Sequence, residues 1–257
     1  RGLCLADGAF ETLRVESGVI SCKRRHATRL SRGLEVLSFP EPIQTALKGI
    51  DEAEVILNNT FPQATGTLRL TLTRGSGPRG YKIPEHQQPR CILRFSPGLG
   101  NFDALTLLTV SRVRWSSQPF FRGCKLLART EQVMALEEAR MRGFADAIMC
   151  DESGSWVSTT SGNLFLRVGE RFITPPVDEV GIAGTRREAT LDYWAEMLGY
   201  QVSVRKISLE DLALAQEAWC CNSVVGIRRI AAVDHFTFTE TTASDALSTC
   251  IHREKTL

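Results

Sequence analysis

The chain has 257 residues, of which 43% are hydrophobic and 23% are charged, and its formal net charge is +2. This is the composition of an ordinary globular protein that is long enough to bury an enzyme-sized core. The near-neutral balance, with arginines spread along the whole chain, argues against nucleic acid as the main partner, and no apolar run has membrane-spanning length.

The first part of the chain predicts a small α/β domain. Alternation of polar and apolar residues predicts strands over four ranges, which are 8–15, 18–22, 67–75 and 90–95. Leucines recur at helical spacing within 24–37, and prolines begin a second amphipathic helix over 40–59. A stretch rich in Pro, Gly and Asn follows. We therefore predict an N-terminal domain over 1–97 and a linker over 98–104.

The rest of the chain predicts a larger C-terminal domain over 105–257. Its expected elements, in chain order, are a strand over 105–115, a loop and helix over 123–143, a meander of strands over 146–176, helices over 185–199 and 208–216, and a strand, turn and strand over 217–234. Strands and helices mixed in this way predict a two-domain fold of the α+β or α/β class.

The segment GSGPRG, residues 75–80, matches the GxGxxG pattern of dinucleotide-binding turns. Such a turn must open into a helix, yet Pro78 and Pro84 interrupt that helix. We therefore reject a dinucleotide site and predict a flexible hairpin loop. Arg74 and Arg79 of this loop are suited to hold an anionic substrate.

A stronger anion site is predicted in GIAGTRREA, residues 181–189. Thr185 followed three residues later by Glu188 has the pattern of a capping box at a helix start. Arg186 and Arg187 stand in the first turn, where positive charge opposes the helix dipole. The sequence thus favours a bound anion at this helix start, although a capping box by itself is more often structural.

Lys125 is the lysine with apolar neighbours on both sides over several positions. Burial lowers the pKa of a lysine and makes its amine a usable nucleophile. The alternative is that the amine reaches solvent along an apolar surface. A nucleophilic lysine and a phosphate-binding helix start in one chain are what pyridoxal phosphate requires.

The chain contains eight cysteines and four histidines, without a CxxC motif or zinc-like spacing. Most of the cysteines lie in apolar, strand-like runs, where a reduced cysteine behaves as a small hydrophobic residue. We therefore expect no metal site and a reducing, cytoplasmic compartment.

Several segments together resemble the class IV aminotransferase family, the fold-type IV pyridoxal-phosphate enzymes. RGLCLADGAFETLRV is similar to the family's RGxxxGDGxFET, and KLLARTEQVMALEEA to its segment around the Schiff-base lysine. TRGSGPRGY is similar to the TRGxGxRGY of the 4-amino-4-deoxychorismate lyase branch. The resemblance continues in the segments HATRL, NLF, TPP, GIAGTRRE and CNSVVGIRRI. It implies a fold like that of D-amino acid aminotransferase, with a cleft between the domains, a homodimer, and a small anionic substrate.

The resemblance also implies roles for individual residues. Lys125 would hold pyridoxal 5'-phosphate covalently and carry the proton during the reaction. The other residues expected to bind the cofactor are Arg29, Ser158, Gly184, Thr185, Arg186, Asn222 and Ser223. The residues expected to bind the substrate are Phe10, Arg74, Arg79 and Tyr81.

The implied reaction converts 4-amino-4-deoxychorismate to 4-aminobenzoate and pyruvate, a step toward folate. Three departures from the family stand out: Ser158 replaces the glutamate that faces the pyridine nitrogen, Leu5 and Ala6 replace an aromatic residue and a glycine, and the first two strands of the N-terminal domain are expected to be missing. Two alternatives therefore stay open. One is an aminotransferase acting on D- or branched-chain amino acids, and the other is a catalytically degraded binding protein with the same fold.

Overall fold

The computed structural model describes residues 1–99 and 106–253, which form two compact units. The first unit contains Arg1–Leu99 together with Cys124–Ala128, and the second contains the other described residues. Lys125 thus belongs by its contacts to the unit of the N-terminal sheet, although the sequence placed it in the predicted C-terminal domain. Residues 100–104 of the predicted linker lie outside the described residues, and the predicted domain bounds stay a prediction.

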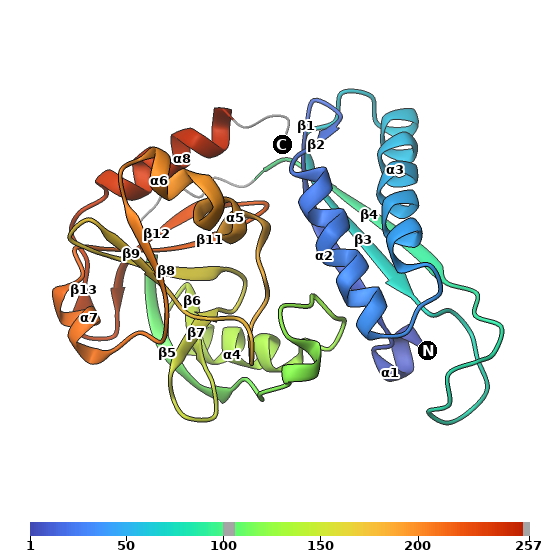
Figure 1. Ribbon diagram of the computed structural model, residues 1–257, viewed down its shortest axis with the longest axis horizontal. Helices are drawn as coiled ribbons and strands as arrows, with labels where there is room; N and C mark the ends of the chain where they lie inside the picture. Colours follow the sequence, from blue (N-terminus) through green and yellow to red (C-terminus); the bar gives the residue numbers. More distant parts are fainter. Residues whose placement is uncertain (100–105, 254–257) are drawn as a thin grey trace. The chain divides into compact units, whose positions relative to one another are not determined.

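The first unit is an antiparallel sheet with two helices on one face (Figure 1). Its strands run in the order β2-β1-β3-β4 and are β1 (Gly8–Glu16), β2 (Val19–Ile20), β3 (Gly66–Thr73) and β4 (Arg90–Pro97). The helices are α1 (Gly2–Leu5), α2 (Lys23–Val36) and α3 (Pro42–Thr60), of which α2 and α3 lie side by side. The predicted strands and both predicted helices of this unit are confirmed.

The two faces of this sheet differ because successive side chains of a strand alternate between them. Leu13, Leu68 and Leu70 are fully or nearly fully buried in the core with apolar residues of α2 and α3. The opposite face carries Phe10 and Thr12 of β1, Arg69 and Thr71 of β3, and Ile92 and Arg94 of β4, in register. We call this second surface the Phe10 face.

The second unit contains a closed barrel. The strands of the second unit are β5 (Thr106–Arg114), β6 (Asp146–Cys150), β7 (Trp156–Thr159), β8 (Asn163–Val168), β9 (Arg171–Thr174), β10 (Gln201–Val204), β11 (Glu217–Asn222), β12 (Gly226–Val233) and β13 (Phe236–Thr237). The sheet order β8-β11-β12-β5-β6-β7 closes on itself because β7 also pairs with β8. Leu108, Ile148, Leu164 and Ile230 are completely or almost completely buried in one of its cores.

Helices complete the second unit (Figure 1). They are the 3₁₀-helix η1 (Pro119–Phe121), α4 (Thr130–Met141), α5 (Thr185–Ala189), the π-helix η2 (Thr190–Trp194), α6 (Ala195–Met197), α7 (Leu209–Leu214) and α8 (Thr242–Arg253). The predicted helix over 185–199 is therefore present as three consecutive segments with a π-helical middle. Within the described residues, none of the helices combines the length and the apolar character that crossing a membrane requires.

Candidate functional site

Lys125 is held beside β1 by backbone pairing. The Phe10 amide donates to the Lys125 carbonyl at 3.0 Å, and the Leu127 amide donates to the Gly8 carbonyl at 3.1 Å. The short lysine segment therefore extends the sheet next to β1. The side chain of Lys125 is half-buried, and its Nζ lies 4.6 Å from the centre of the Phe10 ring. The amine is thus fixed against an aromatic surface, as a cation–π contact favours.

Two arginines that the sequence analysis did not select share the Phe10 face. The Arg69 guanidinium carbon lies 3.7 Å from the centre of the Phe10 ring. Arg69 also lies directly opposite Arg94 across β3 and β4, so two positive charges occupy one cross-strand position. Burial, and then the charge of Arg94, lower the pKa of Arg69. Like charges at such a position disfavour the sheet, and this arrangement is suited to an anion.

Strand alternation in TLRLTLT could have revealed Arg69. Its apolar residues Leu68, Leu70 and Leu72 face the helices, so Arg69 must project to the other face with Phe10. Prediction of the strand alone, without its two faces, therefore left Arg69 outside the predicted site.

Arg29, which the resemblance assigns to the cofactor, lies in a buried ionic cluster on the helix side of the sheet. Its Nε donates to Glu11 Oε1 at 2.8 Å, and His26 Nδ1 lies 2.7 Å from Glu11 Oε2. Burial alone would raise the pKa of Glu11, but the charges of Arg29 and His26 lower it to about 2. Glu11 is therefore a carboxylate that orients Arg29 from beneath.

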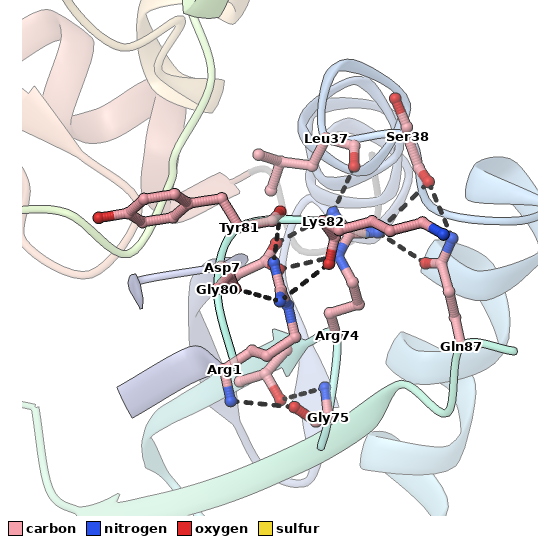
Figure 2. Close-up of polar contacts among 11 residues, drawn as sticks. Arg1, Asp7, Leu37, Ser38, Arg74, Gly75, Gly80, Tyr81, Lys82 and Gln87 are labelled. Carbon is pink, nitrogen blue, oxygen red and sulfur yellow. Dashed lines mark hydrogen bonds and ion pairs between the residues drawn. The ribbon is translucent and has the colours of Figure 1, made fainter. Parts of the chain in front are cut away.

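Arg74 is a correction to the predicted substrate-binding set. Its side chain is 2% exposed, and its guanidinium makes five hydrogen bonds within the chain (Figure 2). The acceptors are both carboxylate oxygens of Asp7, the carbonyls of Leu37 and Ser38, and the side chain of Gln87. An arginine has five N–H donors, so none is left for a substrate. Arg74 holds the loop that follows it.

Arg79 and Tyr81 lie on that loop, between β3 and β4, and both are exposed. The ring of Tyr81 is 87% exposed and points away from the polar network at the base of the loop (Figure 2). These two side chains remain accessible to a ligand. Of the three residues of this segment predicted to bind the substrate, Arg74 is therefore buried, whereas Arg79 and Tyr81 are exposed.

The helix start at Thr185 differs from the predicted capping box. Gly184 is the N-cap, Thr185 is the first helical residue, and Glu188 pairs with Arg187 at 3.0 Å. Thr185 Oγ1 is buried and has no hydrogen-bond partner among the described residues. A buried hydroxyl without a partner is unfavourable unless a ligand supplies one. The predicted cap was wrong, but the uncapped hydroxyl supports an anion site at the same residue.

The backbone before this helix is closely packed. A Cβ atom on Gly184 would lie 2.0 Å from Asn163 Oδ1, so a larger residue there would have to displace the Asn163 side chain. Asn163 Nδ2 donates to the Ile182 carbonyl at 2.8 Å and holds the same loop. The first amide bonded within the helix is that of Glu188, which donates to the Gly184 carbonyl. The preceding amides of the first turn are those that a helix leaves for other acceptors.

The remaining predicted cofactor residues belong to the second unit, as Thr185 does. Arg186 is 1% exposed in the first helical turn. Ser158, on β7, is 5% exposed, and its Oγ donates to the Thr159 carbonyl at 2.8 Å. Asn222 Oδ1 accepts the amides of Val224 and Val225, so Asn222 shapes the turn that carries the half-buried Ser223. Asn222 is therefore well placed to orient Ser223.

Comparison with known proteins adds to this geometry. The family model for amino-transferase class IV matches residues 8–233. The chain is 30% identical to an aminodeoxychorismate lyase of Vibrio harveyi, over 91% of this chain and 85% of that protein. It is 31% identical to branched-chain-amino-acid aminotransferase 6 of Arabidopsis thaliana, over 95% of this chain and 73% of that protein.

A solved structure agrees with these relatives. The crystal structure of 4-amino-4-deoxychorismate lyase from Pseudomonas aeruginosa superposes with a TM-score of 0.86 at 30% identity, and the match covers 100% of this chain and 94% of that chain. The two-domain fold expected from the sequence is thereby confirmed. The chain belongs to the class IV aminotransferase family, whose enzymes depend on pyridoxal phosphate.

Proposed function

We propose that this protein is a pyridoxal-phosphate-dependent lyase that converts 4-amino-4-deoxychorismate to 4-aminobenzoate and pyruvate. The observation that carries the proposal is the Phe10 face, where the Lys125 amine and the Arg69 guanidinium lie against one aromatic ring and Arg94 lies opposite Arg69 on the neighbouring strand. The similarity to aminodeoxychorismate lyases supports the same reaction.

The charge of the Phe10 face supports this substrate over a simple amino acid. 4-Amino-4-deoxychorismate carries two carboxylates and a six-membered ring. Arg69 and Arg94 offer two guanidinium groups for the carboxylates, and Phe10 offers a flat apolar surface for the ring. The exposed Arg79 and Tyr81 complete the proposed substrate-binding set. An amino acid with one carboxylate would leave part of this positive charge unmatched.

The helix start at Thr185 is the proposed binding site for the phosphate group of the cofactor. The partnerless hydroxyl of Thr185, the first-turn amides and the tight backbone at Gly184 fit the phosphate of pyridoxal phosphate. We assign Thr185, Gly184, Arg186 and Ser223 to this phosphate, with Asn222 orienting Ser223. Arg29 completes the assignment, held by Glu11.

The proposed proton carrier is Lys125. When bound, the cofactor supplies an electron sink for the charge that remains after a proton leaves the substrate. Lys125 takes that proton from the ring carbon that bears the amino group. The bond between the ring and the enolpyruvyl oxygen then breaks, the ring becomes aromatic, and the departing group accepts a proton to become pyruvate. Phe10 keeps the amine of Lys125 at a fixed position during the transfer.

Ser158 also favours an elimination over a transamination. A hydroxyl cannot stabilise a positively charged pyridine ring as a carboxylate does, so the electron sink is weaker. Transamination depends on that sink more than an elimination that forms an aromatic ring. The second candidate function, aminotransfer on D- or branched-chain amino acids, is favoured by the similarity to the Arabidopsis enzyme.

The test is a set of turnover measurements with the purified protein and added cofactor. We expect release of 4-aminobenzoate from 4-amino-4-deoxychorismate, and loss of that release in Lys125→Ala. Bleaching of the cofactor absorbance by D-alanine or leucine, without 4-aminobenzoate release, would establish the aminotransferase instead. Turnover that requires Lys125 would exclude a degraded binding protein.

Two further parts of the proposal concern assembly and compartment. We assign a homodimer on the strength of the family resemblance, and light scattering of the purified protein tests it. Cys150, Cys220 and Cys221 are buried within strands, where reduced cysteines act as small hydrophobic residues, and this supports a reducing, cytoplasmic location. Localisation of a fluorescently tagged chain in its own cell tests the location.

A further inference from the structure

The backbone of the loop between β3 and β4 is held by hydrogen bonds from one arginine side chain. Arg1 Nη1 donates to the carbonyls of Gly80 and Lys82, each at 3.3 Å, and Nη2 donates to the carbonyl of Tyr81 at 3.4 Å (Figure 2). Three consecutive carbonyls thus point at one guanidinium. The side chain of Arg1 is only 6% exposed.

Asp7 joins this arginine to the buried base of the loop. Arg1 Nε lies 2.7 Å and Arg74 Nε lies 2.8 Å from the same oxygen, Asp7 Oδ2. Burial alone would raise the pKa of Asp7, but its bonds to Arg74 and Arg1 lower it. The carboxylate therefore stays charged and keeps the two guanidinium groups together despite their like charge.

The glycines of the loop permit this close approach. A Cβ on Gly77 would lie 3.0 Å from Arg1 Cδ, and a Cβ on Gly75, whose φ is +82°, would lie 2.0 Å from the Gln88 carbonyl oxygen. The backbone can thus close over the Arg1 side chain. The glycines that sequence analysis took as signs of flexibility make room for an anchor.

The anchored carbonyls belong to the residues that the proposed function needs. Gly80 and Tyr81 directly follow Arg79, and the side chains of Arg79 and Tyr81 are turned to solvent while the backbone is held inside. We propose that Arg1 is a positioning residue, bridged through Asp7 to Arg74, which fixes the loop so that Arg79 and Tyr81 meet the anionic substrate. This inference rests on the proposed lyase function.

The geometry distinguishes Arg1 from other cations. Lysine at this position could still pair with Asp7. Its single ammonium nitrogen cannot, however, replace the three nitrogens of Arg1, of which two donate to the three carbonyls and one donates to the carboxylate of Asp7. Arg1→Lys should therefore be intermediate between the unsubstituted protein and Arg1→Met. Glu85→Gln is the matched control, because it breaks the exposed ion pair with Lys82 in the same loop without touching Arg1.

The experiment measures kcat and KM for 4-amino-4-deoxychorismate and the rate of trypsin cleavage after Arg79 or Lys82, all on the cofactor-loaded protein. For Arg1→Met we expect KM and the cleavage rate each to rise about tenfold, as loss of charge-assisted hydrogen bonds predicts. We expect kcat to stay within about twofold, because the reacting groups are untouched. Arg1→Lys should raise both values less, and Glu85→Gln should raise neither.

Two results would overturn the inference. Faster cleavage with an unchanged KM would make Arg1 a structural anchor without a role in substrate binding, and a fall in kcat at constant KM would place it elsewhere in the reaction. A complete lack of turnover in the unsubstituted protein would instead contradict the proposed function. The cleavage rates would then still test the anchor, and equal rates in Arg1→Met and the unsubstituted protein would refute it.

Discussion

Arg69 lies directly opposite Arg94 in the register of β3 and β4, so two guanidinium groups share one cross-strand position on the Phe10 face. In the empty protein this pair is unfavourable, by up to about 1 kcal/mol for like charges that face one another. A dianionic substrate would pair with both guanidinium groups and offset the repulsion between them. Stability and substrate binding should therefore respond in opposite directions when one of the two charges is removed.

Arg69→Met tests this relationship. We expect KM for 4-amino-4-deoxychorismate to rise about tenfold to a hundredfold, because a charge-assisted hydrogen bond contributes roughly 1.5–3 kcal/mol. The melting temperature of the cofactor-free protein should rise or stay the same. Kinetics and thermal unfolding measure the two effects. Arg32→Met, which removes an exposed arginine of α2, should change neither, and a lowered melting temperature with normal KM would contradict the assignment.

Thr185→Val tests the anion site at the helix start. The substitution keeps the shape of the side chain and removes a hydroxyl that has no partner among the described residues. We expect about tenfold weaker binding of pyridoxal phosphate, with no loss of stability in the cofactor-free protein. Absorbance titration and thermal unfolding provide the two measurements.

Thr174→Val is the matched control for Thr185. Thr174 Oγ1 is equally buried but donates to the Leu164 carbonyl at 2.8 Å. This control should lose about 1–3 kcal/mol of stability, because a buried carbonyl loses its donor, and should keep its affinity for the cofactor. The account of Thr185 fails if both variants show the same pattern.

The lowered pKa of Glu11 predicts that the N-terminal sheet loses stability in acid. Its pKa is lowered from 4.5 to about 2, so its ion pair stabilises the fold above pH 4.5 and is lost as the pH falls toward 2. The contribution at neutral pH is about 3 kcal/mol, from the two to three pKa units involved. Urea unfolding of Glu11→Gln at about pH 6 and about pH 3 should show a smaller loss on acidification than the unsubstituted protein.

The control for this prediction is Glu35→Gln, which changes an exposed glutamate of α2. It should retain the full loss of stability between the two pH values. An identical pH dependence in Glu11→Gln and the unsubstituted protein would show that the cluster of Glu11, His26 and Arg29 does not control acid unfolding.

Ser158→Glu would restore the glutamate that the family resemblance places beside the pyridine nitrogen. Ser158 is buried, so a new carboxylate there should destabilise the cofactor-free protein. A positively charged pyridine ring would compensate that charge. We therefore expect pyridoxal phosphate to raise the melting temperature of Ser158→Glu more than that of Ser158→Gln, which has the same size without the charge. Equal increases would contradict a position next to the ring nitrogen.

Local sequence patterns were sufficient for most elements of the fold. The alternation of Leu68, Leu70 and Leu72 with polar residues predicted β3, and leucines at helical spacing predicted α2. The helix α8 was not predicted, although Ala243, Leu247 and Ile251 recur at helical spacing and are buried. Closure of the barrel through β7 and β8 depends on pairing that a periodic pattern does not reveal.

The site was less accessible to sequence reasoning because its residues are defined by distant partners. Arg74 was expected to face a substrate, but it binds Asp7 and the end of α2, which are far away in sequence. Thr185 and Glu188 had the spacing of a capping box, yet the helix begins one residue earlier than that motif requires, and Glu188 pairs with Arg187. Local spacing identified the correct segments in both cases but assigned the wrong contacts.

The central claim is that the amine of Lys125, held against Phe10, is the group that carries the cofactor. The most direct measurement is reduction of the cofactor-loaded protein with borohydride, followed by trypsin digestion and mass spectrometry. The account predicts the mass of the reduced cofactor on the peptide of residues 123–129, and its loss in Lys125→Ala. Recovery of the cofactor on another lysine, or on no peptide at all, would contradict it.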